Sequence, residues 1–266
     1  MTRRSPSQVR RAIWIAGLCC TAGLPLPALA ELTNDPMAGP GLRSRPAYDG
    51  ATTQRLELVP VIRYFGQPWF ARSTQGVLEA GIRGELLPGL HAGAQLAYEP
   101  GRQASGADFL RNHHVADIAS GASYGAQLEW DHSFGPMPIT LLMRARKHAD
   151  AALGAQADLR LSAGVFQSGR LAAGLFTQAT WADAATTASF YGINAVAAAV
   201  TGLPVFAPRR GWLFASVGLL GSVELSPKWV IVGSLEARRL RGEAARSPMV
   251  QRASNHYASA GLAYRF

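Results

Sequence analysis

Beyond its first 30 residues the sequence has no cysteine and no long apolar run. Its only cysteines, Cys19 and Cys20, lie in an N-terminal segment that we expect to be removed, so we expect no disulfide in the mature chain. No stretch of about 18 consecutive apolar residues follows residue 30, and we therefore expect no transmembrane helix. Composition does not separate a membrane β-protein from a soluble one, so the strand pattern must decide.

The excess of positive over negative charge is also small. The formal net charge is +9, but Arg3, Arg4, Arg10 and Arg11 fall in residues 1–30, which contain no acid. The remaining 236 residues (266 − 30) carry 9 − 4 = +5. This excess is too small and too scattered to favour nucleic-acid binding. A basic interior, or affinity for anionic lipid or glycan, stays open.

Residues 1–30 have the order of a secretory signal peptide. The four arginines precede the apolar run Ala12–Leu18, and Ala28-Leu29-Ala30 forms an A-x-A cleavage site. Pro25 and Pro27 interrupt the apolar stretch, which disfavours a membrane anchor. We expect the mature chain to begin near Glu31.

Ten segments alternate between apolar and polar residues, a period of two that only strands have. Each offers one apolar face, and the segments exceed the typical five or six residues of soluble strands. At roughly 3.3 Å per residue and with a strand tilt, ten residues span about 25 Å, the height of an outer-membrane apolar band. The segments are Gln54–Phe65, Gly76–Leu86, Leu90–Glu99, Ala122–Asp131, Ile139–Arg146, Ala155–Val165, Leu171–Trp181, Leu213–Glu224, Trp229–Arg238 and the last strand, which ends at Phe266.

Aromatic residues sit near the segment ends on the apolar face, where membrane barrels carry aromatic girdles; a soluble sandwich core would place them nearer the strand centres. These residues are Tyr64, Tyr98, Trp130, Trp181, Trp229 and Tyr264. Short and long connections also alternate, as periplasmic turns and external loops do. The pattern predicts an all-β fold, a transmembrane antiparallel up-and-down β-barrel.

The parity of the connections predicts ten strands. Twelve are possible if Trp69–Arg72 and Ser189–Ile193 each add a short strand. We expect residues 31–50 to form a periplasmic lead-in, extended or a small plug, and residues 51–266 to form the barrel. The last strand is then expected to close the barrel against Gln54–Phe65.

The opposite face of the segments is polar and carries both signs of charge. A barrel of about ten strands is too narrow for a wide aqueous pore. Because unpaired buried charges are costly, we expect a lumen filled by Arg–carboxylate pairs, with a narrow channel as the alternative. The charged residues are Arg55, Glu57, Arg63, Glu79, Arg83, Glu85, Glu129, Arg144, Arg146, Asp158, Arg160, Glu236 and Arg238.

Catalytic residue types cluster at one place only. His113 and His114, with Asp108 and Asp117 in the same predicted loop, could bind a transition metal or serve as a base. Paired loop histidines are more often merely exposed. We therefore expect no enzyme, no cofactor and no catalytic or metal residues, with a small barrel enzyme acting on lipid A or peptides as the alternative. His148-Ala-Asp150 and Asn255-His256 have still less support.

The chain ends on Phe266, after an alternating strand with an apolar outer face. This ending resembles the assembly signal of bacterial outer-membrane barrels, which implies that the barrel-assembly machinery recognises Phe266.

Short blocks in the predicted strands and loops resemble the MipA/OmpV family, which is named for a protein that interacts with the lytic transglycosylase MltA. They run from about residue 41 to the end of the chain, and their order and spacing are more specific than any one of them. The blocks are Gly41–Gly50, Pro60–Tyr64, Gly101-Arg102, Asp108–Leu110, Asp117-Ile118, Ser189–Ile193, Gly202-Leu203 and Gly211. Arg111–Val115 departs from the family's Gly-rich turn, and Phe190-Tyr191 reverses its usual aromatic order.

The resemblance implies a non-enzymatic protein of the Gram-negative outer membrane, in contact with its lipid. It also implies a scaffold that joins a murein hydrolase to a peptidoglycan synthase, or a barrel for envelope stress or adhesion. A soluble periplasmic binding protein is the third possibility.

Overall fold

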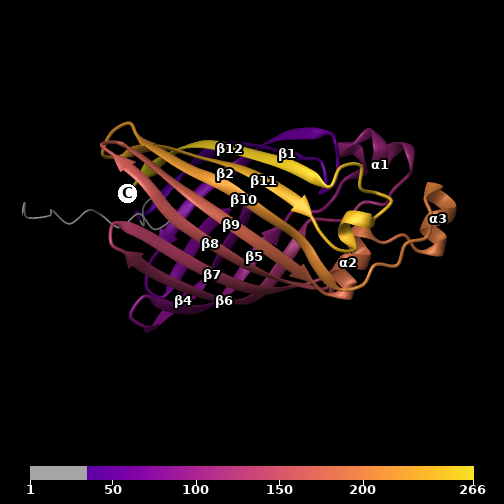
Figure 1. Cartoon of the computed structure of the whole chain (residues 1–266), viewed down its shortest axis with the longest axis horizontal. Coiled ribbons are helices and arrows are strands. Elements are labelled where there is room, and N and C mark those ends of the chain that lie inside the picture. The colour runs from indigo at the N-terminus through magenta and orange to yellow at the C-terminus, as the bar shows by residue number, and fades with distance from the viewer. Residues whose placement is uncertain (1–34) are drawn as a thin grey trace, which may run out of the picture.

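A computed structural model describes residues 35–266, which form one closed antiparallel β-barrel of twelve strands (Figure 1). Each strand pairs with its neighbours in sequence, and β12 pairs with β1 to close the barrel. The predicted signal peptide, residues 1–30, lies outside the described residues. The strands are β1 Met37–Pro46, β2 Gln54–Phe65, β3 Trp69–Thr74, β4 Val77–Leu87, β5 Leu90–Glu99, β6 Gly121–Phe134, β7 Met137–His148, β8 Ala155–Ser168, β9 Leu171–Ala182, β10 Gly211–Glu224, β11 Trp229–Leu240 and β12 Ser254–Arg265.

The predicted all-β barrel is confirmed, with the larger of the two strand numbers. β3 is the short strand expected near Trp69, but Ser189–Ile193 adds none, because its residues run from the end of helix α2 (Ala184–Tyr191) into the following loop. The twelfth strand is β1, which lies within the expected lead-in of residues 31–50, and β12 therefore closes against β1 and not against Gln54–Phe65.

The prolines of β1 interrupt its alternation of apolar and polar residues, so the sequence pattern does not predict this strand. Pro40 lies directly opposite Pro60 of β2. Neither residue has an N–H, so the two fit a pairing position of the kind that exchanges no hydrogen bonds. Gly39 adds a close approach, since a Cβ there would lie 2.0 Å from the carbonyl oxygen of Leu262. The prolines of β1 and β2 can therefore lie within paired strands at this position.

The predicted outward face is apolar as expected. Mid-barrel leucines such as Leu219 and Leu235 are 50% and 56% exposed, and Tyr64, Tyr98, Trp130 and Trp229 are exposed near the strand ends. Leu213 is the exception. It was expected to face outward but is buried, because a β-bulge between Trp212 and Phe214 turns Trp212 outward instead.

The two ends of the barrel differ. At one end, here the turn end, the strands are joined by residues 66–68, 88–89, 135–136, 169–170 and 225–228. At the other, the loop end, the connections are 47–53, 75–76, 100–120, 149–154, 183–210 and 241–253. Figure 1 shows the helices gathered at the loop end and Phe266 at the turn end. The connection between β2 and β4 contains β3 and two tight turns.

The remaining elements are short and belong to the loop end. They are η2 Ala104–Gly106, α1 Asp108–Asn112, η3 Ala151–Leu153, α2, α3 Ala195–Thr201 and η4 Ala244–Arg246. Within residues 35–266 none of the helices has the length and apolar character needed to cross a bilayer.

Candidate functional site: the lumen and the loop cap

The lumen contains a buried ion-pair cluster centred on Glu79 of β4. The side chain of Glu79 is completely buried. Its carboxylate accepts a hydrogen bond of 2.8 Å from Nε of Arg72 and another from Arg144, and Nη1 of Arg146 lies 3.5 Å away. Three guanidinium groups therefore surround one carboxylate.

The cluster continues along β3–β8, which we call the charged wall. Arg72 also reaches Glu129 at 2.7 Å, and Arg146 reaches Glu99 at 3.0 Å. The ion pairs of this wall join four arginines to four acids, so the formal charges of the paired residues cancel. They are Arg72, Arg83, Arg144, Arg146, Glu79, Glu99, Glu129 and Asp158. The predicted Arg–carboxylate filling is confirmed here, whereas Glu85 is exposed at the turn end and accepts from the amide of Gly89.

Near the turn end, the lumen side of β1, β2, β11 and β12 carries an apolar group of side chains, which we call the apolar wall. Met37, Val230 and Ala263 are buried there, and Val61 and Val232 pack against them. These five side chains face inward because each lies on the strand parity opposite to the exposed leucines and aromatics. Farther toward the loop end the same strands carry ion pairs, Arg43 with Glu57 and Arg238 with Glu236.

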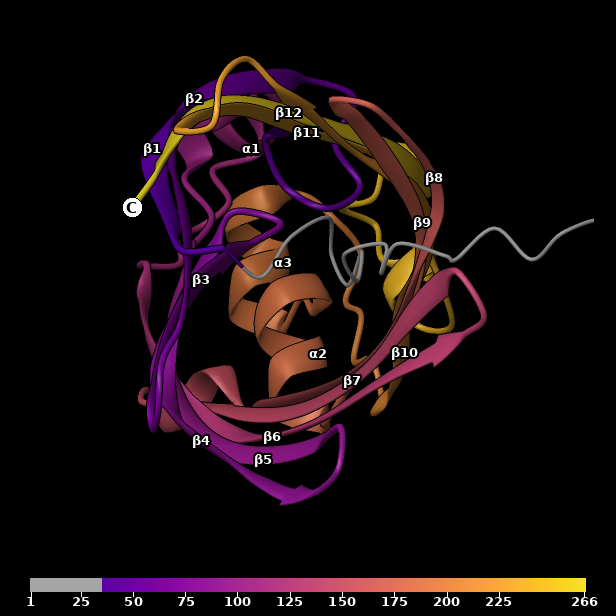
Figure 2. The same ribbon diagram turned by 90° about the vertical axis from the view of Figure 1, so that its left-hand side faces the viewer.

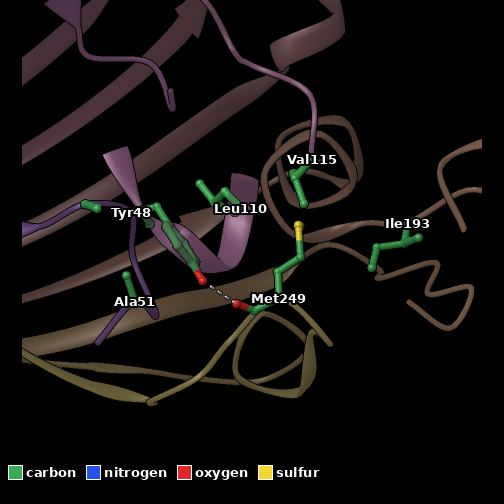
Figure 3. Close-up of a cluster of buried hydrophobic side chains, with 8 residues drawn as sticks. Tyr48, Ala51, Leu110, Val115, Ile193 and Met249 are labelled. Atoms are coloured by element: carbon green, nitrogen blue, oxygen red, sulfur yellow. Dashed lines mark hydrogen bonds between the residues drawn. The ribbon is translucent and has the colours of Figure 1, made fainter. Parts of the chain in front are cut away.

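The loop end is closed by a hydrophobic cluster built from four loops, here the loop cap (Figure 3). Its side chains come from connections that lie far apart in the sequence, and the hydroxyl of Tyr48 donates a 2.9 Å hydrogen bond to the carbonyl of Met249. Viewed from the turn end in Figure 2, α2 and α3 stand across the mouth of the barrel. The buried residues are Ala47, Tyr48, Ala51, Ala107, Leu110, Val115, Ile193 and Met249.

Polar side chains tie the cap together. Arg102 is buried and donates to the carbonyl of Phe190 at 2.8 Å and to that of Ala116 at 3.3 Å. Burial lowers the pKa of Arg102 and raises the pKa of Tyr48 to about 12, because the charged form of each group loses hydration. Asn255, near the start of β12, holds the 47–53 loop, since it accepts from the amide of Gly50 at 2.9 Å and donates to the carbonyl of Ala51 at 2.8 Å.

Within the described residues, the histidines and aspartates of the β5–β6 loop are not among the groups whose ligand atoms lie close enough to hold a metal ion. Nδ1 of His113 lies 2.9 Å from the carbonyl of Thr201, which ties α1 to α3. Asp108 pairs with Arg111, and Asp117 accepts from the amide of Ala104 at 2.6 Å. Each of these polar groups has a structural partner in the cap.

The weaker candidates are also separate. His148 is buried at the loop end of β7, beside the ring of Phe190. Asp150 caps η3, because its carboxylate accepts a hydrogen bond from the amide of Ala152. The carboxamide of Asn255 lies in the cap, whereas the carbonyl of its neighbour His256 accepts from Gln54.

One possible metal-ligand group was missed by sequence analysis. His91, Glu129 and Asp131 bring ligand atoms within 4.8 Å of one another near the turn end. Strand register creates this group, because His91 of β5 lies directly opposite Glu129 of β6. Glu129 is already paired with Arg72 and Arg83, each at 2.7 Å. Two guanidinium groups at this carboxylate oppose a metal cation.

Except for Pro60–Tyr64 and Gly211, the blocks that carry the family resemblance lie in or beside the loop cap. Tyr48 of the first block, Leu110 of the loop block and Ile193 of the last block all lie in its hydrophobic cluster. Arg102 and Ile118, from two further blocks, form an isolated β-bridge. The shared sequence pattern therefore encodes the packing of the loops over the barrel mouth.

Comparison with solved structures gives outer-membrane barrels of low sequence identity. LpxR from Salmonella typhimurium has a TM-score of 0.46 at 8% identity, covering 86% of this chain and 100% of the other. An outer-membrane channel from Pseudomonas putida F1 has a TM-score of 0.42 at 11% identity, covering 88% and 97%. A bacterial polysaccharide outer-membrane secretin gives 0.41 at 8%, covering 88% and 99%.

Comparison with curated proteins gives no match. The family model described as "MltA-interacting protein MipA" matches residues 38–266, which span the chain from the start of β1 to Phe266. By this match over nearly the whole barrel, the chain belongs to the MipA family.

Proposed function

We propose that this chain is an outer-membrane barrel that acts as a non-enzymatic scaffold for a peptidoglycan-remodelling enzyme. The observation that carries the proposal is the match of the whole barrel to a family described as MltA-interacting. The apolar, aromatic-bordered outer face fits a bilayer. In this arrangement the turn end, with Phe266, faces the periplasm, where such an enzyme would work.

Two features favour a binding role over transport or catalysis. The loop cap covers one mouth of the barrel, and paired charges fill part of its lumen. His113 and Asp117 of the β5–β6 loop bind different backbone groups of the cap, the carbonyl of Thr201 and the amide of Ala104. A barrel with this interior presents surfaces to partners at its two ends.

Photo-crosslinking in cells tests the proposal. A photoreactive amino acid would replace Ser168, the last residue of β8, or Lys228 in the 225–228 turn, both exposed at the turn end. The matched control would replace Val196, which is 76% exposed on α3 at the loop end. We expect the lytic transglycosylase of the same cell to crosslink to the turn-end positions and not to Val196. Capture of no murein enzyme at either turn, with the barrel correctly folded, would refute the scaffold role.

A further inference from the structure

The barrel wall is incomplete where β2 and β3 separate. β2 pairs with β3 only through Arg63, Tyr64 and Phe65. The nine residues 54–62 (62 − 54 + 1) therefore extend toward the loop end without a strand on that side in the described structure. β3 ends at Thr74, and the chain turns back into β4. We call the space between this edge of β2 and the β3–β4 turn the notch.

Local chemistry at the notch suits a permanent strand edge. The hydroxyl of Ser73 accepts a 3.0 Å hydrogen bond from the amide of Ile62, which replaces the missing ladder bond. Two residues on, Pro60 has no N–H to satisfy. Leu56 and Leu58 are 71% and 81% exposed, more than Leu219 or Leu235 in the middle of the wall, because no neighbouring strand shields them.

A cavity of about 150 Å³ lies directly behind the notch. Its lining includes Pro60 and Ile62, whose side chains belong to the outward-facing parity of β2, together with residues Ser73 and Gln75 beside the notch. It also includes Val230 on the far, inner side of the lumen. Residues from both sides of the notch therefore line this cavity, which borders the unpaired edge of β2.

The inner lining is partly apolar and partly cationic. Met37, Val61, Val230 and Val232 of the apolar wall form one side. The charged side chains in the lining are Arg43, Arg63, Arg160 and Glu236, three guanidinium groups to one carboxylate.

The single acid of this lining already has partners. Glu236 pairs with Nε of Arg238 at 3.0 Å and accepts from Gln75 at 2.9 Å. Arg160 stacks over the ring of Phe176 at 3.9 Å. A second cavity of about 190 Å³ lies toward the cap, and Arg43 lines both cavities. A cationic group thus stands where an apolar chamber meets a polar one.

We propose that this cavity binds one acyl chain with an anionic head group, which enters sideways through the notch. The apolar wall would receive the hydrocarbon chain, and Arg43 with its neighbouring guanidinium groups would hold the carboxylate or phosphate. A lateral path leads from the hydrocarbon layer into the lumen without passing the loop cap. This binding role goes beyond the scaffold function and does not depend on any protein partner.

Fluorescence titration of the mature barrel in detergent micelles tests the proposal, with dansyl-labelled undecanoic acid as the probe. We expect saturable binding of one probe per barrel. The methyl ester of the probe should bind about tenfold more weakly, a loss of about 1.4 kcal/mol, because it lacks the charge. Unlabelled oleate and lysophosphatidic acid serve as competitors that separate a free fatty acid from a phospholipid as the natural source. Displacement by either supports the site, and displacement by neither overturns it.

Matched tryptophan variants locate the site. Val232→Trp fills the cavity, whereas Ile231→Trp adds the same bulk to the outer face of the same strand. We expect the first variant to lose at least about tenfold in probe affinity and the second to bind like wild type. Val59→Trp and Leu58→Trp repeat the comparison on β2, should Val232→Trp lose the heat-dependent gel mobility of a folded barrel. Equal probe affinity in a folded cavity variant and its control, or of acid and ester in wild type, would overturn the proposal.

Discussion

The Glu79→Gln variant tests whether the charged wall determines the stability of the barrel. Glu79 is fully buried among Arg72, Arg144 and Arg146. The substitution keeps the shape of the side chain but removes one negative charge from a wall whose four paired arginines and four paired acids are balanced. A buried guanidinium group is then left without compensation, and breaking a buried ion pair in this way costs about 3–5 kcal/mol. We expect a free energy of unfolding lower by that amount.

Equilibrium urea unfolding in lipid vesicles, followed by tryptophan fluorescence, measures this change. Glu224→Gln is the control: it breaks a pair with Arg265 of similar length, 2.7 Å, but the side chain of Glu224 is 40% exposed. Exposed pairs contribute about 0–1 kcal/mol, so the control should unfold almost like wild type. Adding Arg144→Met to Glu79→Gln should restore part of the loss, because it removes the surplus charge. Equal, small effects of Glu79→Gln and Glu224→Gln would refute the reasoning.

Three further predictions concern the cap and the outer face. Tyr48→Phe removes the hydrogen bond to the carbonyl of Met249, and should weaken the cap by about 1 kcal/mol, seen as faster proteolysis of the loops in folded barrels. The pKa of Tyr48 is raised to about 12 by burial, so its contribution to cap stability is complete below the ordinary pKa near 10 and is lost as pH rises to about 12. Loop proteolysis should accelerate across that range in wild type, and an unchanged rate, or the same acceleration in Tyr48→Phe, would contradict it. Leu219→Arg, in the middle of the outer face, should cost about 2–4 kcal/mol by vesicle unfolding, and Leu225→Arg, in a turn, about 0–1; equal costs would argue against membrane insertion at this depth.

The family blocks illustrate how far local sequence could lead. Tyr48, Leu110 and Ile193 were recognisable as parts of family motifs, yet nothing in their spacing showed that they share one hydrophobic cluster. They lie in different loops, and loops carry no periodicity that fixes their contacts. The His113–His114 pair was likewise visible as a cluster, but its role in linking α1 to α3 depends on the position of Thr201, far along the chain.

The number of strands could not be predicted from local sequence for a related reason. β2 and β4–β12 alternate over many residues because each must present an apolar face outward and a polar face inward. β1 contains two glycines and two prolines, so its side chains carry little alternation. Its place in the sheet comes from pairing with β2 and β12, which are non-local contacts.

The sequence by itself determined the barrel, its outward face and the charges of its lumen, because a period of two and the cost of burying unpaired charge act on neighbouring residues. The tertiary structure decided which charges pair, how four loops close one mouth, and that the wall opens beside β2. These features depend on strand register and on where β3 ends, which bring together residues more than 200 positions apart, such as Tyr48 and Met249 (|i−j| = 201). The notch and the cavity behind it exist only once the barrel has closed.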